Sequence, residues 1–443
     1  MTKFDLDKQT IKDLGIFDDI RYTNSISNFY NQTKTTGGKN FLYRLMRNPI
    51  ADIEELRQRT ELIQFLIETD FDLKINSGQF DYIEHYQRLS IVPLKNNFVD
   101  AFFQNLSYKI KPTNDYYLIK SGVQQLVYLM NQLQEKMELL NNIDIPIKLD
   151  LHLKCISELI EKPDFKFVYN DKLKINYSKL NKLDSLFRKK YKNETNKVIE
   201  LIYQLDAFIA LAEVAKEQKL TLPNYSELKN QSLSIEEFYH PLLNNAVPYS
   251  IEINNSSNLC FLTGPNMAGK STFLKSVGLS VYLAHIGFPV PAKKMRTTIY
   301  NGIVTTINIS DDVNLGYSHF YSEVQRIKET VLKIKEKNNL FVIFDELFRG
   351  TNVKDAFDGS LLIIKAFSKI PDCTFFISTH ITEVAEEINH LKNIQFKSFG
   401  SKLIDKVPSY DYKLENGISY ERLGLQILKN ENIIEILDSI KNK

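Results

Sequence analysis

A glycine-containing loop is the segment of this sequence whose residue types and spacing could most directly do chemistry. Residues 264–271 read Gly-Pro-Asn-Met-Ala-Gly-Lys-Ser and fit the pattern G-x-x-x-x-G-K-[ST]. An apolar run precedes the loop and a segment with helical spacing of apolar residues follows it, as a phosphate-binding loop requires. Its backbone N–H groups would point at phosphate oxygens, and the N-terminus of the following helix would add positive charge. We predict a nucleotide site formed by Gly264, Pro265, Asn266, Met267, Ala268, Gly269, Lys270, Ser271 and Thr272.

Four side chains have distinct predicted roles in this chemistry. Lys270 should reach the β- and γ-phosphates of ATP, and the Ser271 hydroxyl should ligate Mg²⁺. Asp345 and Glu346 end the apolar run 340–344, where two carboxylates are costly unless they are used. We predict that Asp345 binds the metal ion, commonly through water, and that Glu346 is the general base that polarises the attacking water. Without the glycine loop, the two acids could instead belong to a solvated loop.

Three short apolar runs, at 259–262, 340–344 and 374–377, each end at polar residues. Runs of this length suit strands that are buried on both faces, and helical segments between them indicate a parallel sheet. Because ligands bind at the carboxyl ends of such strands, we expect these polar residues to lie together. His380 follows the third run and is a further catalytic candidate that could sense the γ-phosphate, although an isolated histidine is more often structural.

The first half of the chain has a different pattern. Its apolar residues recur at spacings of three and four, which indicates long helices. We expect an all-α domain over residues 1–235, followed over residues 236–443 by an α/β domain with a mainly parallel sheet. For the first half, the periodicity is equally compatible with a plain helical bundle. The clearest periodic sets are Leu126, Met130, Leu133, Met137 and Leu140, and Val198, Leu201, Ile202, Leu205, Phe208, Ile209 and Ala212.

Composition limits the class of protein. The chain has 443 residues, 43% hydrophobic and 25% charged, which is a globular composition with room for two or more domains. A net charge of +2 neither requires nor excludes a nucleic-acid partner. The three cysteines, Cys155, Cys260 and Cys373, are too far apart to predict a disulfide framework or a metal cluster. The sequence has no apolar signal core and no run long enough to span a membrane, so we expect a cytoplasmic protein.

Several motifs in the second half resemble the MutS family. The loop reads Thr-Gly-Pro-Asn-Met-Ala-Gly-Lys-Ser-Thr at 263–272, where the usual family form is T-G-P-N-M-G-G-K-S-T. The resemblance implies an ABC-type P-loop ATPase domain that binds ATP and Mg²⁺ and hydrolyses the nucleotide. Other similar motifs follow in the family's order: His240-Pro241, Gly287 to Ala292 (G-x-x-V-P-A), Asp345-Glu346 with Arg349-Gly350-Thr351 (D-E-x-x-R-G-T), and Ser378-Thr379-His380 (S-T-H).

The resemblance also implies a partner subunit. In the family's motif D-D-x-x-x-G-x-S-T-F-x-x-E, the serine faces the nucleotide of the other subunit. Ser318 holds that position in segment 311–323, so we expect a homodimer through the ATPase domains, with composite sites. The family's threonine is His319 here, which puts the detail of that contact in question. Tyr249 falls near the family's adenine-stacking aromatic residue, and its alternative is a packed surface tyrosine. Two placements stay open for the family's D-G pair: Asp355-Ala356 without gaps, or Asp358-Gly359 with an insertion.

The first half is similar to the helical core and lever region of the same family. The segments from Thr36 to Glu54 and from Leu205 to Glu213 carry this resemblance. Because it begins within the first few tens of residues, we expect a form that lacks the N-terminal mismatch-binding and connector domains. The family implies a DNA-binding ATPase related to mismatch repair or to the processing of DNA structures. A nucleotide-switched scaffold acting on a protein partner is the alternative, which stimulation of ATP turnover by DNA would separate.

A basic run is the candidate contact for DNA. Its residues could neutralise backbone phosphates without reading bases, so binding would be salt-sensitive and not specific for mismatches. A solvated helix face is the alternative explanation. The densest part is Arg188, Lys189, Lys190 and Lys192, with Lys172, Lys174, Lys179 and Lys182 upstream and Tyr177, Phe187 and Tyr191 interleaved.

Overall fold

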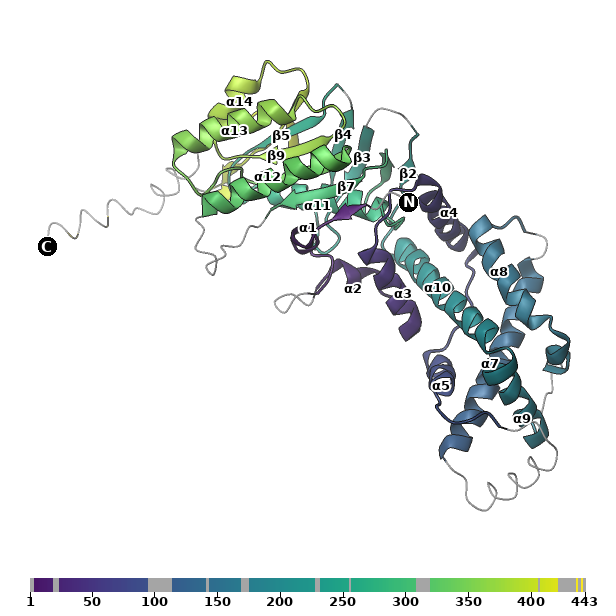
Figure 1. The fold of residues 1–443 in the computed structure, drawn as a ribbon. Coiled ribbons are helices and arrows are strands. Elements are labelled where there is room, and N and C mark those ends of the chain that lie inside the picture. The colour runs from purple at the N-terminus through teal and green to yellow at the C-terminus, as the bar shows by residue number, and fades with distance from the viewer. Residues whose placement is uncertain are drawn as a thin grey trace. The chain divides into compact units, whose positions relative to one another are not determined.

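The computed structural model describes the chain as two compact units (Figure 1). The described residues are 4–18, 24–94, 114–140, 143–168, 175–227, 232–254, 256–307, 319–404 and 407–420, with residues 436 and 440. The sheet unit consists of Met1–Phe29, Met46–Arg57 and Gln218–Lys443, and the helical unit consists of Tyr30–Leu45 and Gln58–Glu217.

The division between the units corrects the predicted boundary at residue 235. Residues 1–29, 46–57 and 218–235 belong to the sheet unit, not to the helical unit. Strand pairing explains this at the N-terminus, because β1 (Asp5–Leu6) lies parallel to β7 (Gly302–Thr306). A two-residue strand has no periodicity to recognise, and its partner lies in the other half of the sequence.

The sheet unit is built on a 7-stranded sheet in the order β1-β7-β8-β9-β5-β10-β13. All neighbouring strands are parallel except β10 and β13. Every residue of β5, β8 and β9 is buried, which matches the three apolar runs and confirms the predicted parallel sheet. The strands not yet given are β5 (Leu259–Thr263), β8 (Leu340–Phe344), β9 (Thr374–Ser378), β10 (Ile394–Phe399) and β13 (Leu414–Asn416).

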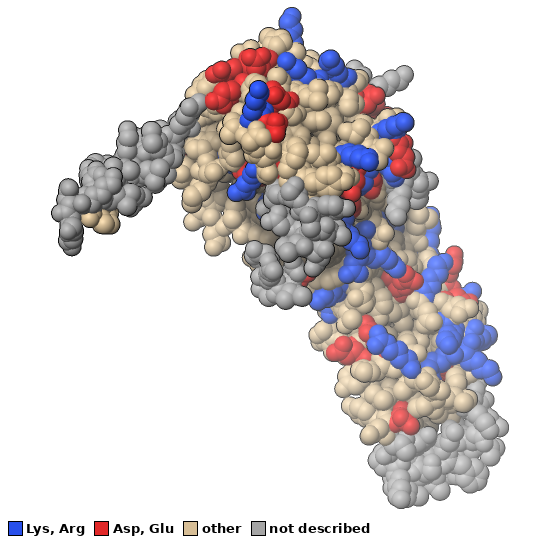
Figure 2. Space-filling model, turned by 60° about the vertical axis from the view of Figure 1, so that its left-hand side comes forward, with Lys and Arg blue, Asp and Glu red and all other residues tan. Residues whose placement is uncertain are grey.

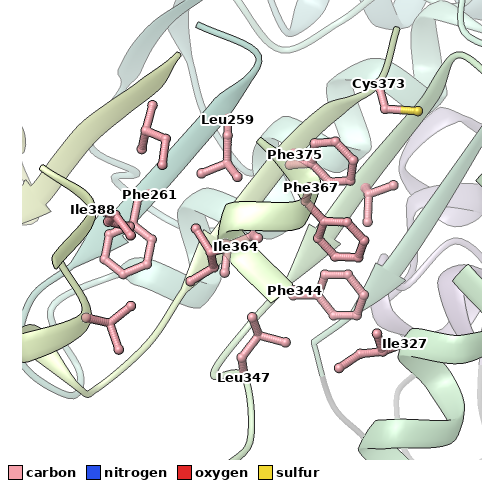
Figure 3. Packing of buried hydrophobic residues seen from close by; sticks show 14 of the residues in the cluster. Leu259, Phe261, Ile327, Phe344, Leu347, Ile364, Phe367, Cys373, Phe375 and Ile388 are labelled. Carbon is pink, nitrogen blue, oxygen red and sulfur yellow. The ribbon is translucent and has the colours of Figure 1, made fainter. Parts of the chain in front are cut away.

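Apolar side chains cover both faces of this sheet and hold its strand ends in place. On one face, the rings of Phe344, Phe367 and Phe375 stack, with centroids 5.9 Å and 4.7 Å apart along the row (Figure 3). Alternate residues of β8 point to the other face, where Ile343 lies so close to Gly278 that a Cβ there would be 2.8 Å away. The helices of the unit include α1 (Lys8–Asp13), α11 (Lys270–Ala284), α12 (His319–Lys337), α13 (Val353–Phe367) and α14 (Thr382–Ile388).

A smaller sheet in the order β2-β6-β3-β4 belongs to the same unit. Residues of β4 alternate between buried and exposed, as expected for a sheet with one packed face and one solvated face. This sheet could not be predicted from the sequence, because its strands are short and half polar. Its strands are β2 (Asn224–Tyr225), β3 (Ser232–Phe238), β4 (Tyr249–Asn254) and β6 (Lys294–Thr297), and a separate hairpin pairs β11 (Lys402–Ile404) with β12 (Val407–Ser409).

The helical unit is all-α in its described residues, which agrees with the periodic apolar pattern. The two predicted periodic sets lie on α7 (Asn114–Leu140) and α10 (Lys192–Glu217). In the part of the chain that the structure describes, no helix is long and apolar enough to cross a membrane. The other helices are α2 (Ile26–Tyr30), α3 (Thr36–Arg47), α4 (Ile53–Thr69), α5 (Ser77–Gln87), α8 (Ile147–Ile160), η1 (Pro163–Val168), α9 (Tyr177–Ser185) and η2 (Leu186–Lys190), of which α2, α3 and α4 cross the boundary between the units.

Two adjacent glycines at the start of α3 have a packing role. A Cβ on Gly37 would lie 2.3 Å from the Tyr203 ring, and one on Gly38 would lie 2.2 Å from an Asp206 oxygen. Asp206, on α10, accepts hydrogen bonds from the backbone N–H groups of residues 34 and 35 and from the Thr35 hydroxyl. These glycines therefore allow α3 and α10 to approach closely. Packing between the two helices explains this part of the segment from Thr36 to Glu54, which resembles the family.

Candidate functional site

The glycine loop joins β5 to α11, and its two glycines have left-handed backbone angles. Gly264 and Gly269 have φ values of +135° and +110°, which side chains disfavour. At Gly264 a Cβ would also lie 2.6 Å from the Phe399 carbonyl oxygen. Ala268 stands where the family usually has glycine. It is buried, and its φ is negative, so its backbone conformation does not require glycine. Met267 has φ +66° and a side chain that is 81% exposed, so it projects from the loop into solvent.

Lys270 is held against the loop that contains it. Its Nζ donates hydrogen bonds to the carbonyl oxygens of Gly264 at 2.7 Å and Pro265 at 3.0 Å, and the residue is 4% exposed. Burial lowers the pKa of Lys270, and the nearby charges of Glu346 and Asp345 oppose that shift. The ammonium group thus lies against the loop and feels the charges of the two acids, and it is in reach of an anion bound by the loop.

Asp345 follows β8 and meets the first turn of α11. Its Oδ1 accepts a 2.5 Å hydrogen bond from the Ser378 hydroxyl, and Ser271 provides a second hydroxyl hydrogen bond. Burial raises the pKa of Asp345, while these hydrogen bonds act in the opposite direction. A carboxylate beside a hydroxyl is a donor set that suits Mg²⁺, so the two predicted metal ligands lie together and fit the ion.

Glu346 has an unusual backbone and two side-chain partners, His380 and Arg349. Its φ is +60°, and its amide donates to the Ser378 hydroxyl oxygen at 3.0 Å. The carboxylate lies 2.6 Å from His380 Nε2 and 3.3 Å from an Arg349 nitrogen. The hydrogen bond from His380 is the main cause that lowers the pKa of Glu346, so the carboxylate is ionised at neutral pH. A left-handed glutamate that is fixed from both sides has the rigidity expected of a group that orients water.

The order of the strands explains why these residues meet. β9 lies between β8 and β5, and all three are parallel, so their carboxyl ends share one edge of the sheet. The acids follow β8, the glycine loop follows β5, and His380 follows β9 between them. Within the loop, Pro265 and Thr272 are half-buried and Asn266 is exposed.

Ser318 and Tyr249 are the two predicted nucleotide contacts that lie outside the glycine loop. Ser318 lies outside the described residues, so its proximity to any nucleotide stays a prediction. Tyr249 is 5% exposed, and its ring packs edge-on against Phe273 and Phe399, with centroids 5.4 Å and 5.8 Å away. Its hydroxyl lies near the loop, 3.5 Å from the position a Cβ would take on Gly269.

Tyr412 is a residue near the loop that the sequence analysis missed. Its ring lies 3.4 Å from the position a Cβ would take on Gly269, and its side chain is 43% exposed. Tyr412 comes between β12 and β13, far from the motifs in sequence, and a lone tyrosine carries no signal. The strand order supplies what the sequence lacks, because β13 pairs with β10, next to β5.

The basic run of the helical unit needs one correction. Arg188 is 8% exposed, and its guanidinium binds both oxygens of Asp184, at 2.6 Å and 2.8 Å. It also donates to the carbonyl oxygen of Ile91, so the prediction that Arg188 contacts DNA is wrong. Lys189, Lys190 and Lys192 are exposed. Lys172 and Lys174 lie outside the described residues, and Figure 2 shows further Lys and Arg side chains on the helical unit.

The protein belongs to the class in which a parallel α/β sheet carries a phosphate-loop motif and two acids at its carboxyl edge. Residues 260–442 match the family model for MutS domain V, and residues 9–212 match the model for MutS domain III. The chain belongs to the MutS family, in agreement with the motifs of its sequence.

Three relatives of the chain share one name. The DNA mismatch repair protein MutS of Petrotoga mobilis is 30% identical over 261 residues, which are 57% of this chain and 31% of that protein. The MutS of Thermotoga petrophila is 31% identical over 58% of this chain and 32% of its own length. The MutS of Staphylococcus aureus strain JH9 is 28% identical over 56% and 29%, respectively. The chain therefore spans about a third of the length of these curated relatives.

Proposed function

We propose that this protein binds ATP with Mg²⁺ at the carboxyl edge of the main sheet and hydrolyses it, as an ABC-type P-loop ATPase. The observation that carries the proposal is the convergence of Lys270, Asp345 and Glu346 from the ends of two strands that flank β9. A cation for phosphate, an acid for metal and a fixed carboxylate for water are the components that phosphoryl transfer to water needs.

Each residue has a separate role in the proposed reaction. Lys270 binds the β- and γ-phosphates, and the loop N–H groups from Asn266 to Ser271 surround them. Ser271 and Asp345 hold Mg²⁺, which when bound neutralises charge on the phosphates. Glu346 orients and deprotonates the attacking water, and His380 holds the Glu346 carboxylate while facing the γ-phosphate position.

Two tyrosines provide the proposed contacts for the nucleotide base. Both the Tyr412 ring and the Tyr249 hydroxyl lie within 3.5 Å of the Cβ position on Gly269. Tyr412 has the more exposed ring and offers a face for stacking, whereas the ring of Tyr249 is occupied by phenylalanines. We therefore assign the stacking role to Tyr412 and a hydrogen-bonding role to the Tyr249 hydroxyl.

A homodimer through the ATPase domains is the proposed active assembly. The family motif puts Ser318 against the nucleotide of the other subunit, so each site would need both chains. ATP should then strengthen self-association, and sedimentation of wild type with and without ATP measures this. A monomer at micromolar concentration in every nucleotide state would contradict the dimer.

DNA is the proposed macromolecular partner, bound through backbone phosphates. Lys189, Lys190 and Lys192 are exposed on one short stretch of the helical unit and provide positive charge without a base-reading geometry. ATP turnover measured with duplex, branched and single-stranded DNA tests whether DNA is coupled to the nucleotide cycle. Turnover that no DNA changes would favour a protein partner.

The central test measures nucleotide binding and turnover separately. Lys270→Ala should weaken ATP binding about 10- to 100-fold, the size of a lost charge-assisted hydrogen bond. The exposed lysine variant Lys392→Ala is the matched control and should bind as wild type does. Equal affinities for Lys270→Ala and Lys392→Ala would exclude the loop as the phosphate site.

A further inference from the structure

The N-terminal helix α1 carries two acids that reach distant parts of the sheet unit. Asp7 precedes the helix as its N-cap, and Asp13 is its last residue. Asp13 contacts β7 and Asp7 contacts α12, and both elements are about 300 residues further along the chain. The proposed ATPase mechanism uses neither acid, so their arrangement asks for a separate explanation.

Asp13 fixes the carboxyl end of β7. It is 3% exposed, and its Oδ2 accepts hydrogen bonds from the Thr305 hydroxyl at 2.8 Å and the Ile307 backbone N–H at 3.0 Å. Thr10, one turn earlier, accepts a 3.0 Å hydrogen bond from the Thr305 backbone N–H. Side chains of α1 thus satisfy the donors that β7 presents beyond the short β1 pairing.

Asp7 fixes α12 against the same strand end. Its carboxylate accepts from two Arg326 nitrogens, at 2.8 Å and 3.2 Å, and from Lys333 Nζ at 2.9 Å. Arg326 also donates to the Thr305 carbonyl oxygen at 2.8 Å. Burial alone would raise the pKa of Asp7, but the hydrogen bonds and charge of Arg326 outweigh it and hold the pKa well below its ordinary value. Asp7 is therefore an ionised anchor.

The clamped elements connect to the proposed site. β7 ends at Thr306, whose carbonyl oxygen accepts a 2.9 Å hydrogen bond from the Asp345 backbone N–H. After Ile307 the chain continues through residues 308–318 to α12, and this stretch contains the predicted partner-facing Ser318. The two acids of α1 thus hold both elements that border this stretch and the strand against which Asp345 is aligned.

We propose that Asp7 and Asp13 are positioning residues for ATP turnover, acting through β7 and α12. The inference rests on the proposed ATPase function. It adds that the N-terminal segment is needed for turnover, because it positions β7 and α12 beside the site. Neither acid touches the loop, so nucleotide binding by Lys270 should not depend on them. Turnover should depend on them, because a displacement of about 1 Å at reacting groups can cost about 100-fold.

The test compares Asp13→Asn and Asp7→Asn with Asp18→Asn. Asp18 is an exposed acid of the same segment that contacts the Asn28 side chain, so its substitution makes the same charge change without touching β7 or α12. We expect kcat to fall about 10-fold or more in the first two variants, with ATP affinity within about twofold of wild type. Asp18→Asn should match wild type in both quantities.

Two further variants separate positioning from general stability. Thr305→Val removes one donor to Asp13 while keeping a β-branched residue in the strand, and it should lower kcat in the same direction but less. Asp7→Asn and Arg326→Gln break the same contact. The double variant should therefore lose about as much kcat as the less active of the two single variants, and clearly less than the two losses combined. Additive losses would contradict a shared contact.

The possible results distinguish this inference from the proposed function. If wild type hydrolyses ATP and the Asp7 and Asp13 variants do so at the wild-type rate, the positioning role is wrong and the ATPase proposal stands. If these folded variants lose ATP affinity as much as kcat, the acids support the whole unit and the positioning role is also wrong. If wild type does not hydrolyse ATP, or if Glu346→Gln hydrolyses it as fast as wild type does, the proposed function is wrong. The positioning role of the two acids is then wrong as well.

Discussion

Buried acids in the two units have different surroundings. In the helical unit, Asp184 is saturated by its own chain, since Arg188 binds both its oxygens and Tyr86 and the Leu94 backbone N–H also donate to it. In the sheet unit, Asp345 receives hydroxyl hydrogen bonds from Ser378 and Ser271, and burial raises its pKa. Among the described residues, no cationic side chain contacts Asp345 directly in the way that the Arg188 guanidinium contacts Asp184.

This difference separates structural acids from acids that can accept a ligand. A buried ion pair with all its hydrogen bonds made has no capacity left, and removing either partner leaves an uncompensated charge. An acid that is held only by hydroxyl groups keeps lone pairs for a cation. The comparison therefore indicates a structural role for Asp184 and supports the proposal that Asp345 and Glu346 take part in the chemistry.

The largest effect is expected for Glu346→Gln in the sheet unit. The amide keeps the shape of the side chain but cannot accept a proton, so kcat should fall about 100-fold or more while ATP affinity is retained. Stopped-flow binding and steady-state phosphate release measure the two quantities. Glu386→Gln, an exposed glutamate of α14, is the control and should behave as wild type does. A loss of affinity equal to the loss of kcat would remove the distinction between the two kinds of acid.

Removal of Arg188 should have the next largest effect, on stability alone. Arg188→Met leaves Asp184 buried without its partner, and breaking such a pair costs about 3–5 kcal/mol. Urea unfolding followed by circular dichroism should show this loss in the helical transition. Lys189→Met, at the exposed neighbouring position, should change the unfolding free energy little. If Arg188→Met were as stable as Lys189→Met, the Asp184 pair would not be structural.

Acid should destabilise the sheet unit through His285. This residue is fully buried, its Nε2 accepts from the Tyr300 backbone N–H at 2.9 Å, and burial lowers its pKa from 6.5 to about 4. Below pH 6.5 the unfolded chain binds a proton that the folded chain does not bind until about pH 4. Stability should therefore fall between these values, by about 3 kcal/mol from this residue.

Urea titrations at several pH values test this prediction by comparing His285→Gln with wild type. The variant should be less stable at pH 7 and lose less stability on acidification. His152→Gln in the helical unit serves as the matched control. An identical pH dependence in wild type and His285→Gln would show that this histidine is not the source of the acid sensitivity.

The smallest effect is expected for the exposed lysines of the helical unit. The triple variant of Lys189, Lys190 and Lys192 to alanine should weaken duplex binding and reduce the slope of log affinity against log salt by about 0.9 for each phosphate that these lysines neutralise in the wild type. The control replaces Lys74, Lys120 and Lys154, which are exposed elsewhere on the same unit, and makes the same charge change. Equal weakening by both triple variants would exclude a localised DNA contact.

Local pattern predicted which residues meet at the carboxyl edge of the main sheet, but it predicted long-range strand pairing poorly. The glycine loop, the acids after β8 and the histidine after β9 could be predicted because each follows a continuous apolar run, and parallel strands end on one edge. The ion pair between Arg188 and Asp184 could not be recognised from the sequence. Both residues lie in a charged stretch rich in lysine, and nothing in that pattern shows which charged side chains are buried. Tyr412 and β1 were missed because their partners are set by the strand order, which no short motif encodes.

The two-residue strand β1 also protects an edge. β7 is buried along its whole length and pairs with β8 on one side and with β1 on the other. A fragment that begins at Gln218 would present β7 as a bare apolar edge strand, the kind of surface that pairs with other molecules and aggregates. The sheet unit is discontinuous in sequence, so a recombinant domain cut at the helical boundary should be insoluble unless residues 4–18 are joined to it or supplied as a peptide.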